Sequence, residues 1–284
     1  MAKGILFTLI FLYYSIKLFK ANINLNENKN FKIKCGVDKI KSQPQNYNAS
    51  QYQTQDIKHR KLDSNDEYQP IRIHISTRAL SLYLYTYWSL RNKFRNNLNE
   101  VVNYIEKLIK VKPYNQNIRI DRDVLINNNL CYGDESDIIC DDAITGQGIN
   151  TDLVIFPIIL PIFEPSLMYS QNIFKDSLTN RTIVAGLFVS PLVLSKNYSD
   201  FYYKSLFFHE ITHILGFLYD SFQYFPGGLE NTIKSQIDSR GINRTYIITP
   251  KVVQLAKKYY NCDNIIGLEL EDSAARYNRL SRYV

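Results

Sequence analysis

The sequence predicts an α+β domain in which a twisted sheet lies over one helix that carries a His-Glu-x-x-His motif. Two continuous apolar runs, residues 152–156 and 182–190, indicate buried strands. Apolar side chains at spacings of three and four across residues 96–111 indicate an amphipathic helix that packs on the sheet. His209 and His213 lie in a further apolar segment, which we expect to be the central helix.

The first elements of the domain are a strand and a helix. Residues 70–75 alternate apolar and polar side chains, which predicts a strand. His74 falls on its polar side, so we expect a surface residue there rather than a metal ligand. The helix over 96–111 should end before Pro113, because proline cannot continue a helix.

The two apolar runs are expected to be neighbouring strands. Three prolines separate them and predict an irregular loop (Pro157, Pro161 and Pro165). Pro191 closes the second run. We assign to residues 182–190 the role of an exposed edge strand, along which an extended substrate can pair.

The motif helix is predicted over residues 201–217. His209 and His213 are four residues apart, so a helix places both imidazoles on one face, within reach of one zinc ion. Glu210 is placed to act as the general base that takes a proton from a water at the metal. Gly216 lets the chain turn away. The alternative, two ordinary histidines, fits less well with the apolar context and the following glycine.

The order of these elements, strand, helix, strands and then the motif helix, is typical of a zincin-like metallopeptidase domain. Catalytic zinc normally has three protein ligands and a water. The other histidines, His59 and His74, precede the motif, and Tyr219 stands where a metzincin has its third histidine. The third ligand is therefore not found in the motif region.

Beyond the motif, Thr249 and Pro250 predict the start of a helix that runs to about Tyr260. Cys131 and Cys140 flank a short acidic loop, for which a local disulfide is the simplest account. The acidic residues there favour a solvated loop over a calcium site, because regular spacing of oxygen ligands is missing (Asp134, Glu135, Asp137, Asp141 and Asp142).

The N-terminus is expected to direct the chain into the secretory pathway. Lys3, an apolar run and Ala21 predict a signal peptide over residues 1–21, with an uncleaved signal anchor as the alternative. Four sequons are consistent with a secreted or cell-surface, membrane-associated glycoprotein (Asn48, Asn180, Asn197 and Asn243). The formal charge of +7 is dispersed, without basic runs, which argues against nucleic-acid binding.

Residues 22–66 are polar and aperiodic, which predicts a pro-segment or a poorly ordered arm. Two interpretations of Cys35 in this segment stay open. It could be a structural half-cystine, paired with Cys262, or an inhibitory thiolate that caps the zinc until the segment is removed.

The sequence resembles the leishmanolysin (invadolysin-like) family of zinc metalloendopeptidases. The matching segments are the motif with its flanks, 209–217, the runs 152–156 and 181–191, the later segments 249–253, 261–262 and 267–271, and the pro-region motif 35–38, in which Val37 replaces a usual histidine. The resemblance implies one zinc ion on His209 and His213, Glu210 as general base, an inhibitory role for Cys35, and protein or peptide substrates.

The family resemblance also implies an insertion of about sixty residues before the third histidine and a methionine turn beyond it. Residues 67–272 then form an incomplete catalytic domain, and residues 273–284 a divergent tail. The first hypothesis is a zinc metalloendopeptidase with a role in cell adhesion. The alternative is a catalytically inactive member or a truncated gene product that acts in binding or adhesion. With two histidine ligands we expect weak zinc binding and poor cleavage, unless Glu269 or Glu271 completes the site.

Overall fold

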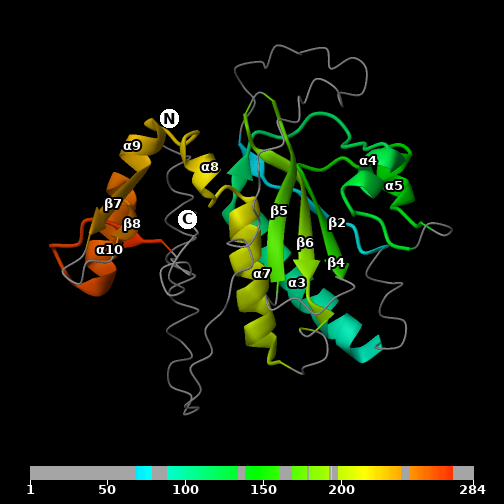
Figure 1. The fold of residues 1–284 in the computed structure, drawn as a ribbon, viewed down its shortest axis with the longest axis horizontal. Helices are drawn as coiled ribbons and strands as arrows, with labels where there is room; N and C mark the ends of the chain where they lie inside the picture. Colours follow the sequence, from blue (N-terminus) through cyan, green and yellow to red (C-terminus); the bar gives the residue numbers. More distant parts are fainter. Residues whose placement is uncertain are drawn as a thin grey trace. The chain divides into compact units, whose positions relative to one another are not determined.

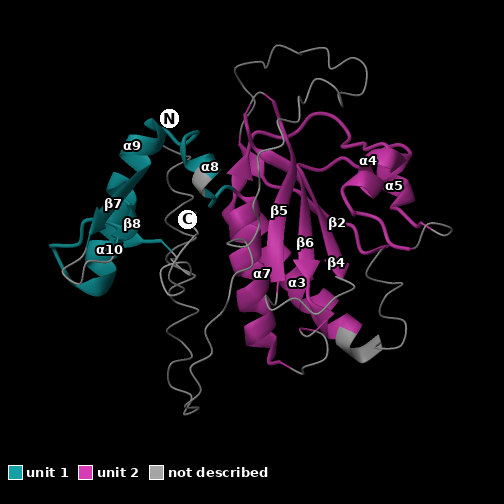
Figure 2. Ribbon diagram, viewed as in Figure 1, with its two compact units in different colours: residues 1–38, 216–284 teal, residues 39–215 magenta. Residues whose placement is uncertain are grey.

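The structure, a computed structural model, describes residues 68–78, 88–133, 138–159, 168–177, 179–191, 193, 198–237 and 243–270. The chain divides into two compact units (Figure 2). We call residues 39–215 the central unit, and residues 216–284 with 1–38 the C-terminal unit. The expectations for the signal peptide, the arm with Cys35 and the tail 273–284 lie outside the described residues.

A four-stranded mixed sheet forms the centre of the central unit (Figure 1). Its order is β2 (Ile73–Ile75), β4 (Leu153–Ile159), β6 (Thr182–Val189) and β5 (Met168–Lys175). The first three strands are parallel and β5 is antiparallel to β6. A separate pair, β1 (Gln69–Pro70) and β3 (Lys110–Val111), is antiparallel. Mixed helix and sheet content confirms the α+β class.

The assignment of residues 182–190 to an exposed edge strand is wrong. β6 pairs with β4 on one side and with β5 on the other, so it is an inner strand. Nearly all of its side chains are buried, and a continuous apolar run is typical of a strand covered on both faces of the sheet. The edge strand beside β6 is β5, and its polar residues Ser170, Gln171 and Asn172 interrupt the apolar pattern in the sequence.

Pro157, expected in a loop, lies inside β4. Ile155 accepts a hydrogen bond from the backbone N–H of Ser76, so its carbonyl faces β2. Residues two apart point their backbone groups to the same side, and the pairing with β2 ends at Ile155. The nitrogen of Pro157 therefore lies where no strand of the described sheet needs a donor, which is where a strand tolerates proline.

Helices cover both faces of this sheet. α4 (Arg122–Asn127) and α5 (Asp142–Thr145) contribute to a buried cluster with β4 and β6 that includes Leu125, Ile144 and Phe156. α7 (Asp200–Ile214) contacts β5, β6 and α3 (Trp88–Leu108). Because the described members of that cluster include no residue of α3 or α7, we place these two helices on the opposite face.

The helix expected over 96–111 is α3, displaced toward the N-terminus. It begins at Trp88 and ends at Leu108, because Lys110 and Val111 are taken into β3. None of the helices among the described residues is both long and apolar enough to span a membrane.

The C-terminal unit contains a second sheet and three helices. The antiparallel strands β7 (Ile233–Ile237), β8 (Asn243–Ile247) and β9 (Leu268–Glu269) lie in this order. α8 (Tyr219–Phe222) and α9 (Gly228–Thr232) precede them, and α10 (Pro250–Tyr260) lies between β8 and β9 in the chain. A cluster of Phe222, Ile247 and Val252 forms the core of this unit. The helix predicted from Pro250 to about Tyr260 is confirmed.

Candidate metal centre

The sequence sets both ends of the motif helix, α7. Ser199 is the N-cap, and its hydroxyl accepts a hydrogen bond from the backbone N–H of Tyr202 at 3.3 Å. Asp200 in the first turn interacts favourably with the helix dipole. At the other end Gly216 has φ +113°, a conformation that side chains with a Cβ rarely adopt. The predicted turn after the motif is therefore present.

Aromatic side chains fix α7 against α3. The rings of Phe94 and Phe207 meet edge-to-face at 4.7 Å between centroids, and Phe94 also lies 6.4 Å from Tyr203. The Tyr203 hydroxyl donates to the carbonyl of Val193 at 2.8 Å. Burial is the main cause that raises the pKa of Tyr203 to about 12, so this donor stays protonated. The helix that carries the motif is thus held in a rigid core contact.

The two motif histidines converge at one point. The Nε2 atoms of His209 and His213 are 3.2 Å apart, and their rings are nearly perpendicular, at 87°. Two nitrogens that each lie about 2.05 Å from one tetrahedral zinc ion are about 3.3 Å apart. The distance between the two nitrogens therefore matches that between two neighbouring corners of a tetrahedral zinc site.

The environment of the pair suits metal binding and proton transfer. Burial lowers the pKa of His209 to about 4, so the imidazole is neutral near pH 7, which is the form that binds metals. Glu210, the next residue, is 1% exposed. A carboxylate shielded from water in this way interacts more strongly with nearby charges than an exposed one does.

Within the described part of the chain, no group of three or more His, Cys, Asp or Glu side chains is placed to hold a metal ion. Glu269 contacts Arg244 through its carboxylate, in the C-terminal unit. His74 lies on β2, where its Nε2 is 3.9 Å from a carboxylate oxygen of Asp141. Cys35, His59 and Glu271 lie outside the described residues. The structure thus brings together two of the predicted ligands.

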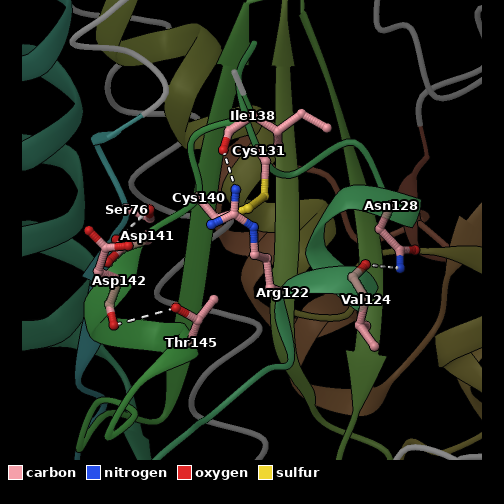
Figure 3. The surroundings of a disulfide bond; sticks show 10 residues. All are labelled: Ser76, Arg122, Val124, Asn128, Cys131, Ile138, Cys140, Asp141, Asp142 and Thr145. Atoms are coloured by element: carbon pink, nitrogen blue, oxygen red, sulfur yellow. Dashed lines mark hydrogen bonds between the residues drawn. A yellow bond between two sulfur atoms is a disulfide. The ribbon is translucent and has the colours of Figure 1, made fainter. Parts of the chain in front are cut away.

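The predicted disulfide between Cys131 and Cys140 is confirmed (Figure 3). Cys262 is a free, exposed cysteine, so the pairing of Cys35 with Cys262 gains no support. Next to the bond, Asp141 caps α5 by accepting a hydrogen bond from the backbone N–H of Ala143.

Asp141 has further partners. His74 and the Ser76 hydroxyl, which donates to Asp141 at 2.6 Å, are the main causes that lower the pKa of this carboxyl to about 2, against the opposing effect of burial. Asp141 therefore has structural partners. Asp134, Glu135 and Asp137 lie outside the described residues.

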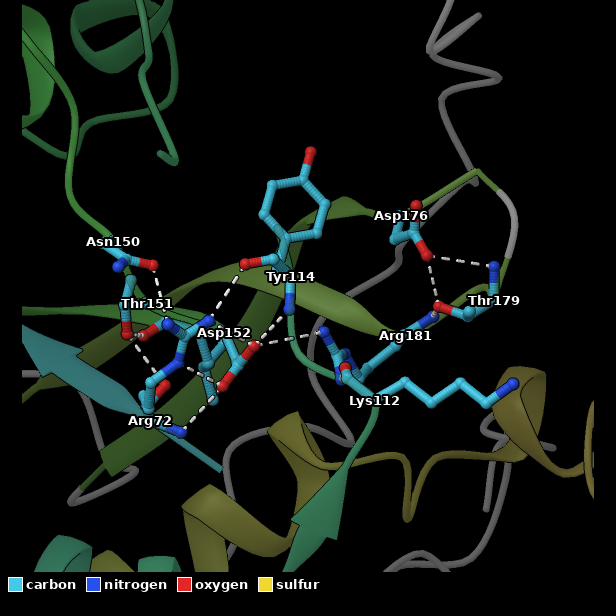
Figure 4. Close-up of polar contacts among 10 residues, drawn as sticks. Arg72, Lys112, Tyr114, Asn150, Thr151, Asp152, Asp176, Thr179 and Arg181 are labelled. Atoms are coloured by element: carbon cyan, nitrogen blue, oxygen red, sulfur yellow. Dashed lines mark hydrogen bonds and ion pairs between the residues drawn. The ribbon is translucent and has the colours of Figure 1, made fainter. Parts of the chain in front are cut away.

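A buried carboxylate that carries no recognisable motif links the starts of three strands of the central sheet (Figure 4). Asp152 is 1% exposed and accepts hydrogen bonds from Arg72 side-chain nitrogens at 2.9 and 3.0 Å and from the backbone N–H of Tyr114 at 2.5 Å. Arg181 lies 3.8 Å away. These contacts join the segments that begin β2, β4 and β6. The available signal was an acidic residue at the head of an apolar run, since buried carboxylates are almost always paired.

The sequence model of the leishmanolysin family matches residues 94–283, which is more than half of the 284-residue chain and contains the whole of α7. No curated protein matches the chain.

Proposed function

The chain belongs to the leishmanolysin family of peptidases, and from this premise we propose that it is a zinc-dependent metalloendopeptidase that acts on proteins or peptides. The observation that supports the proposal is the convergence of His209 and His213, with 3.2 Å between their Nε2 atoms. Because the match to a peptidase family includes both histidines, we interpret their close approach as a pair of metal ligands.

In the proposed mechanism, His209 and His213 would hold the zinc ion. When bound, zinc supplies a Lewis acid that polarises the scissile carbonyl. Glu210 accepts a proton from the attacking water and then donates it to the leaving amine. Its position next to His209 on a rigid helix, and its burial, support this role, because a shielded carboxylate keeps its orientation and its interaction strength.

The edge strand β5 is the proposed docking site for substrate. An extended peptide can add to a sheet edge through backbone hydrogen bonds, and β5 is an edge of the described sheet. The proposal is supported by the contact between β5 and α7, the helix of the histidine pair. β5 takes the place of residues 182–190 in this role.

The experiment that tests the function is a comparison of Glu210→Gln with the wild-type chain in peptide hydrolysis. We expect kcat/KM to fall by about 100-fold to 10,000-fold, the usual contribution of a general base. Zinc content, measured by metal analysis, should stay unchanged, because Glu210 is not a ligand. The matched control is Glu230→Gln in α9, an exposed glutamate that should leave both values unchanged. Turnover that survives Glu210→Gln would contradict the mechanism.

A second candidate is an inactive family member that acts in binding or adhesion. The observation that favours it is that the described residues supply two histidine donors and no third donor nearby. This candidate predicts no hydrolysis by the wild-type chain even when zinc is in excess. Hydrolysis that chelators abolish and zinc restores would exclude it.

We also propose that residues 1–21 direct secretion and that Cys35 is the inhibitory ligand. Both lie outside the described residues. Two of the sequon asparagines, Asn180 and Asn243, are exposed, as acceptors of glycans would be. Increased activity of Cys35→Ser over wild type is the result expected for an inhibitory thiolate, and equal activity would contradict it.

A further inference from the structure

The strand β7 forms an edge of the sheet in the C-terminal unit. Among the described strands it pairs with β8 alone. Four of its residues are exposed, from Lys234 to Ile237. Ile237 is 67% exposed, more than any other exposed large apolar side chain among the described residues. An edge strand whose outer backbone groups pair with no other described strand, and which carries an exposed isoleucine, is a template for another strand.

We propose that β7 is a self-association edge, where a second copy of the chain pairs with it in antiparallel fashion about a two-fold axis at Ser235. The strand reads Ile-Lys-Ser-Gln-Ile, which is nearly symmetric about its centre. In the paired copies Ile233 lies opposite the partner's Ile237, and Lys234 opposite the partner's Gln236. Two copies related by a two-fold axis meet through a surface that is complementary to itself, and the nearly symmetric sequence of β7 meets this requirement.

In this arrangement the exposed side chain of Ile237 would contact a specific residue of the second copy. Residues 233, 235 and 237 lie on the same face of the strand. Ile233 packs against the cluster of Phe222, Ile247 and Val252. In the dimer Ile237 of each copy would therefore lie beside Ile233 of the other, at the margin of that cluster. Burial of this side chain provides the driving force, and the backbone hydrogen bonds provide the direction.

Other registers are less favourable. An axis at Lys234 would place two lysines directly opposite each other, which is destabilising. An axis at Gln236 would place Ile237 opposite the partner's Ser235 and leave Ile233 without a counterpart in β7. The register about Ser235 pairs all five residues and sets no like charges in opposition, so the sequence of the strand selects it.

The dimer should be weak, because a contact of one short strand per copy buries less than the roughly 1,000 Å² typical of stable interfaces. Sedimentation velocity of the full chain at about 1–200 μM should show a concentration-dependent dimer, with a dissociation constant on the order of tens of micromolar. Ile237→Lys should raise this constant at least about tenfold, because it places a charge on the apolar contact. Ile266→Lys is the matched control, since Ile266 is another exposed isoleucine of the same unit, at 42%.

A wild-type chain that stays monomeric over this range would overturn the proposal. Equal weakening by Ile237→Lys and Ile266→Lys would also overturn it, because the effect would then not come from β7. The side chain of residue 237 is exposed, so the variant should keep the far-ultraviolet circular dichroism of the wild type.

A crosslink tests the register without depending on affinity. Directly opposite residues have Cα atoms about 4.5–5.5 Å apart, which lies within the range of disulfides, so two copies of Ser235→Cys can form a disulfide across the axis. Cys35→Ser and Cys262→Ser are introduced in the same chain to remove the two cysteines outside the disulfide of Cys131 and Cys140. Lys234→Cys in the same background faces the partner's Gln236 and should crosslink far less under mild oxidation. Crosslinking of Lys234→Cys at a rate equal to or above that of Ser235→Cys would show the register to be wrong. The proposal is independent of peptidase activity.

Discussion

At the scale of single residues, two buried acidic groups have different surroundings and different roles. Glu210 lies in the motif beside His209, and we propose that it moves protons. Asp152 is equally buried, but Arg72 and the backbone N–H of Tyr114 satisfy its oxygens. A carboxylate with such fixed donors is suited to hold structure, because its proton affinity is reduced.

Replacement of Asp152 by asparagine should destabilise the central unit by about 1.5–3 kcal/mol, because it removes the buried charged acceptor that the partly exposed Arg72 and the backbone N–H of Tyr114 share. Urea unfolding at pH 7 measures the loss. Asp142→Asn is the control, an exposed aspartate in α5 that should cost less than about 1 kcal/mol. A loss as small as that of the control would show that the cluster does not hold the strands.

The stability difference between the wild-type chain and Asp152→Asn should depend on pH. Burial alone would raise the pKa of Asp152, but the hydrogen bonds from Arg72 and Tyr114 outweigh it and lower the pKa. Because the pKa in the folded chain is below the unfolded value of about 3.9, the contribution is fully present above that value and is lost as the pH falls through the folded pKa. The stability difference between wild type and Asp152→Asn should therefore be constant from pH 7 to about pH 5 and shrink below about pH 4.

At the scale of elements, the sequence predicted the helices and strands that have a strong local signal. β4 and β6 were marked by apolar runs, α7 by its motif and α10 by Thr249-Pro250. β5 was missed because Ser170, Gln171 and Asn172 interrupt its apolar pattern. The hairpin of β7 and β8 was missed because exposed strands of five residues carry little apolar pattern. Which strand forms an edge depends on pairing between distant segments, and local pattern does not encode that.

Among the polar contacts, too, local spacing predicted some and not others. The i,i+4 spacing of His209 and His213 determines their convergence once the helix forms, so the sequence alone was sufficient for this pair. The cluster around Asp152 joins residues that are far apart in the chain, such as Arg72 and Arg181. No spacing rule reports such contacts, and the available sign was an acidic residue at the head of an apolar run.

The contact of α3 with α7 gives a prediction at this scale. Phe94 is 0% exposed and touches both Tyr203 and Phe207, so Phe94→Ala should reduce the free energy of unfolding by about 3–5 kcal/mol. Asn96→Ala is the control, an exposed position of the same helix where alanine favours the helical state. Chemical denaturation of the three proteins measures both changes. Similar stabilities for Phe94→Ala and the control would show that the aromatic contact does not hold α7 in place.

At the scale of the whole molecule, the histidine pair connects zinc to stability. A ligand that binds the folded state alone stabilises it by an amount that grows with its concentration, about 2.7 kcal/mol at 100 times the dissociation constant. α7 contacts α3, β5 and β6, so zinc held by His209 and His213 would be linked to the folding of the central unit. This link can be measured without any peptide substrate.

We therefore expect added zinc to raise the thermal midpoint of the wild-type chain by roughly 5–10 °C when zinc is in large excess over its dissociation constant. The double variant His209→Ala/His213→Ala should lose this response, because both described donors are gone. His74→Ala is the matched control, since His74 lies on β2 beside Asp141 and should leave the zinc-dependent shift intact. A series of zinc concentrations separates a weak site from a tight one, since two protein donors bind less tightly than three. A shift of equal size in the double variant would place the zinc elsewhere in the chain, and the assignment of His209 and His213 as ligands would then be wrong.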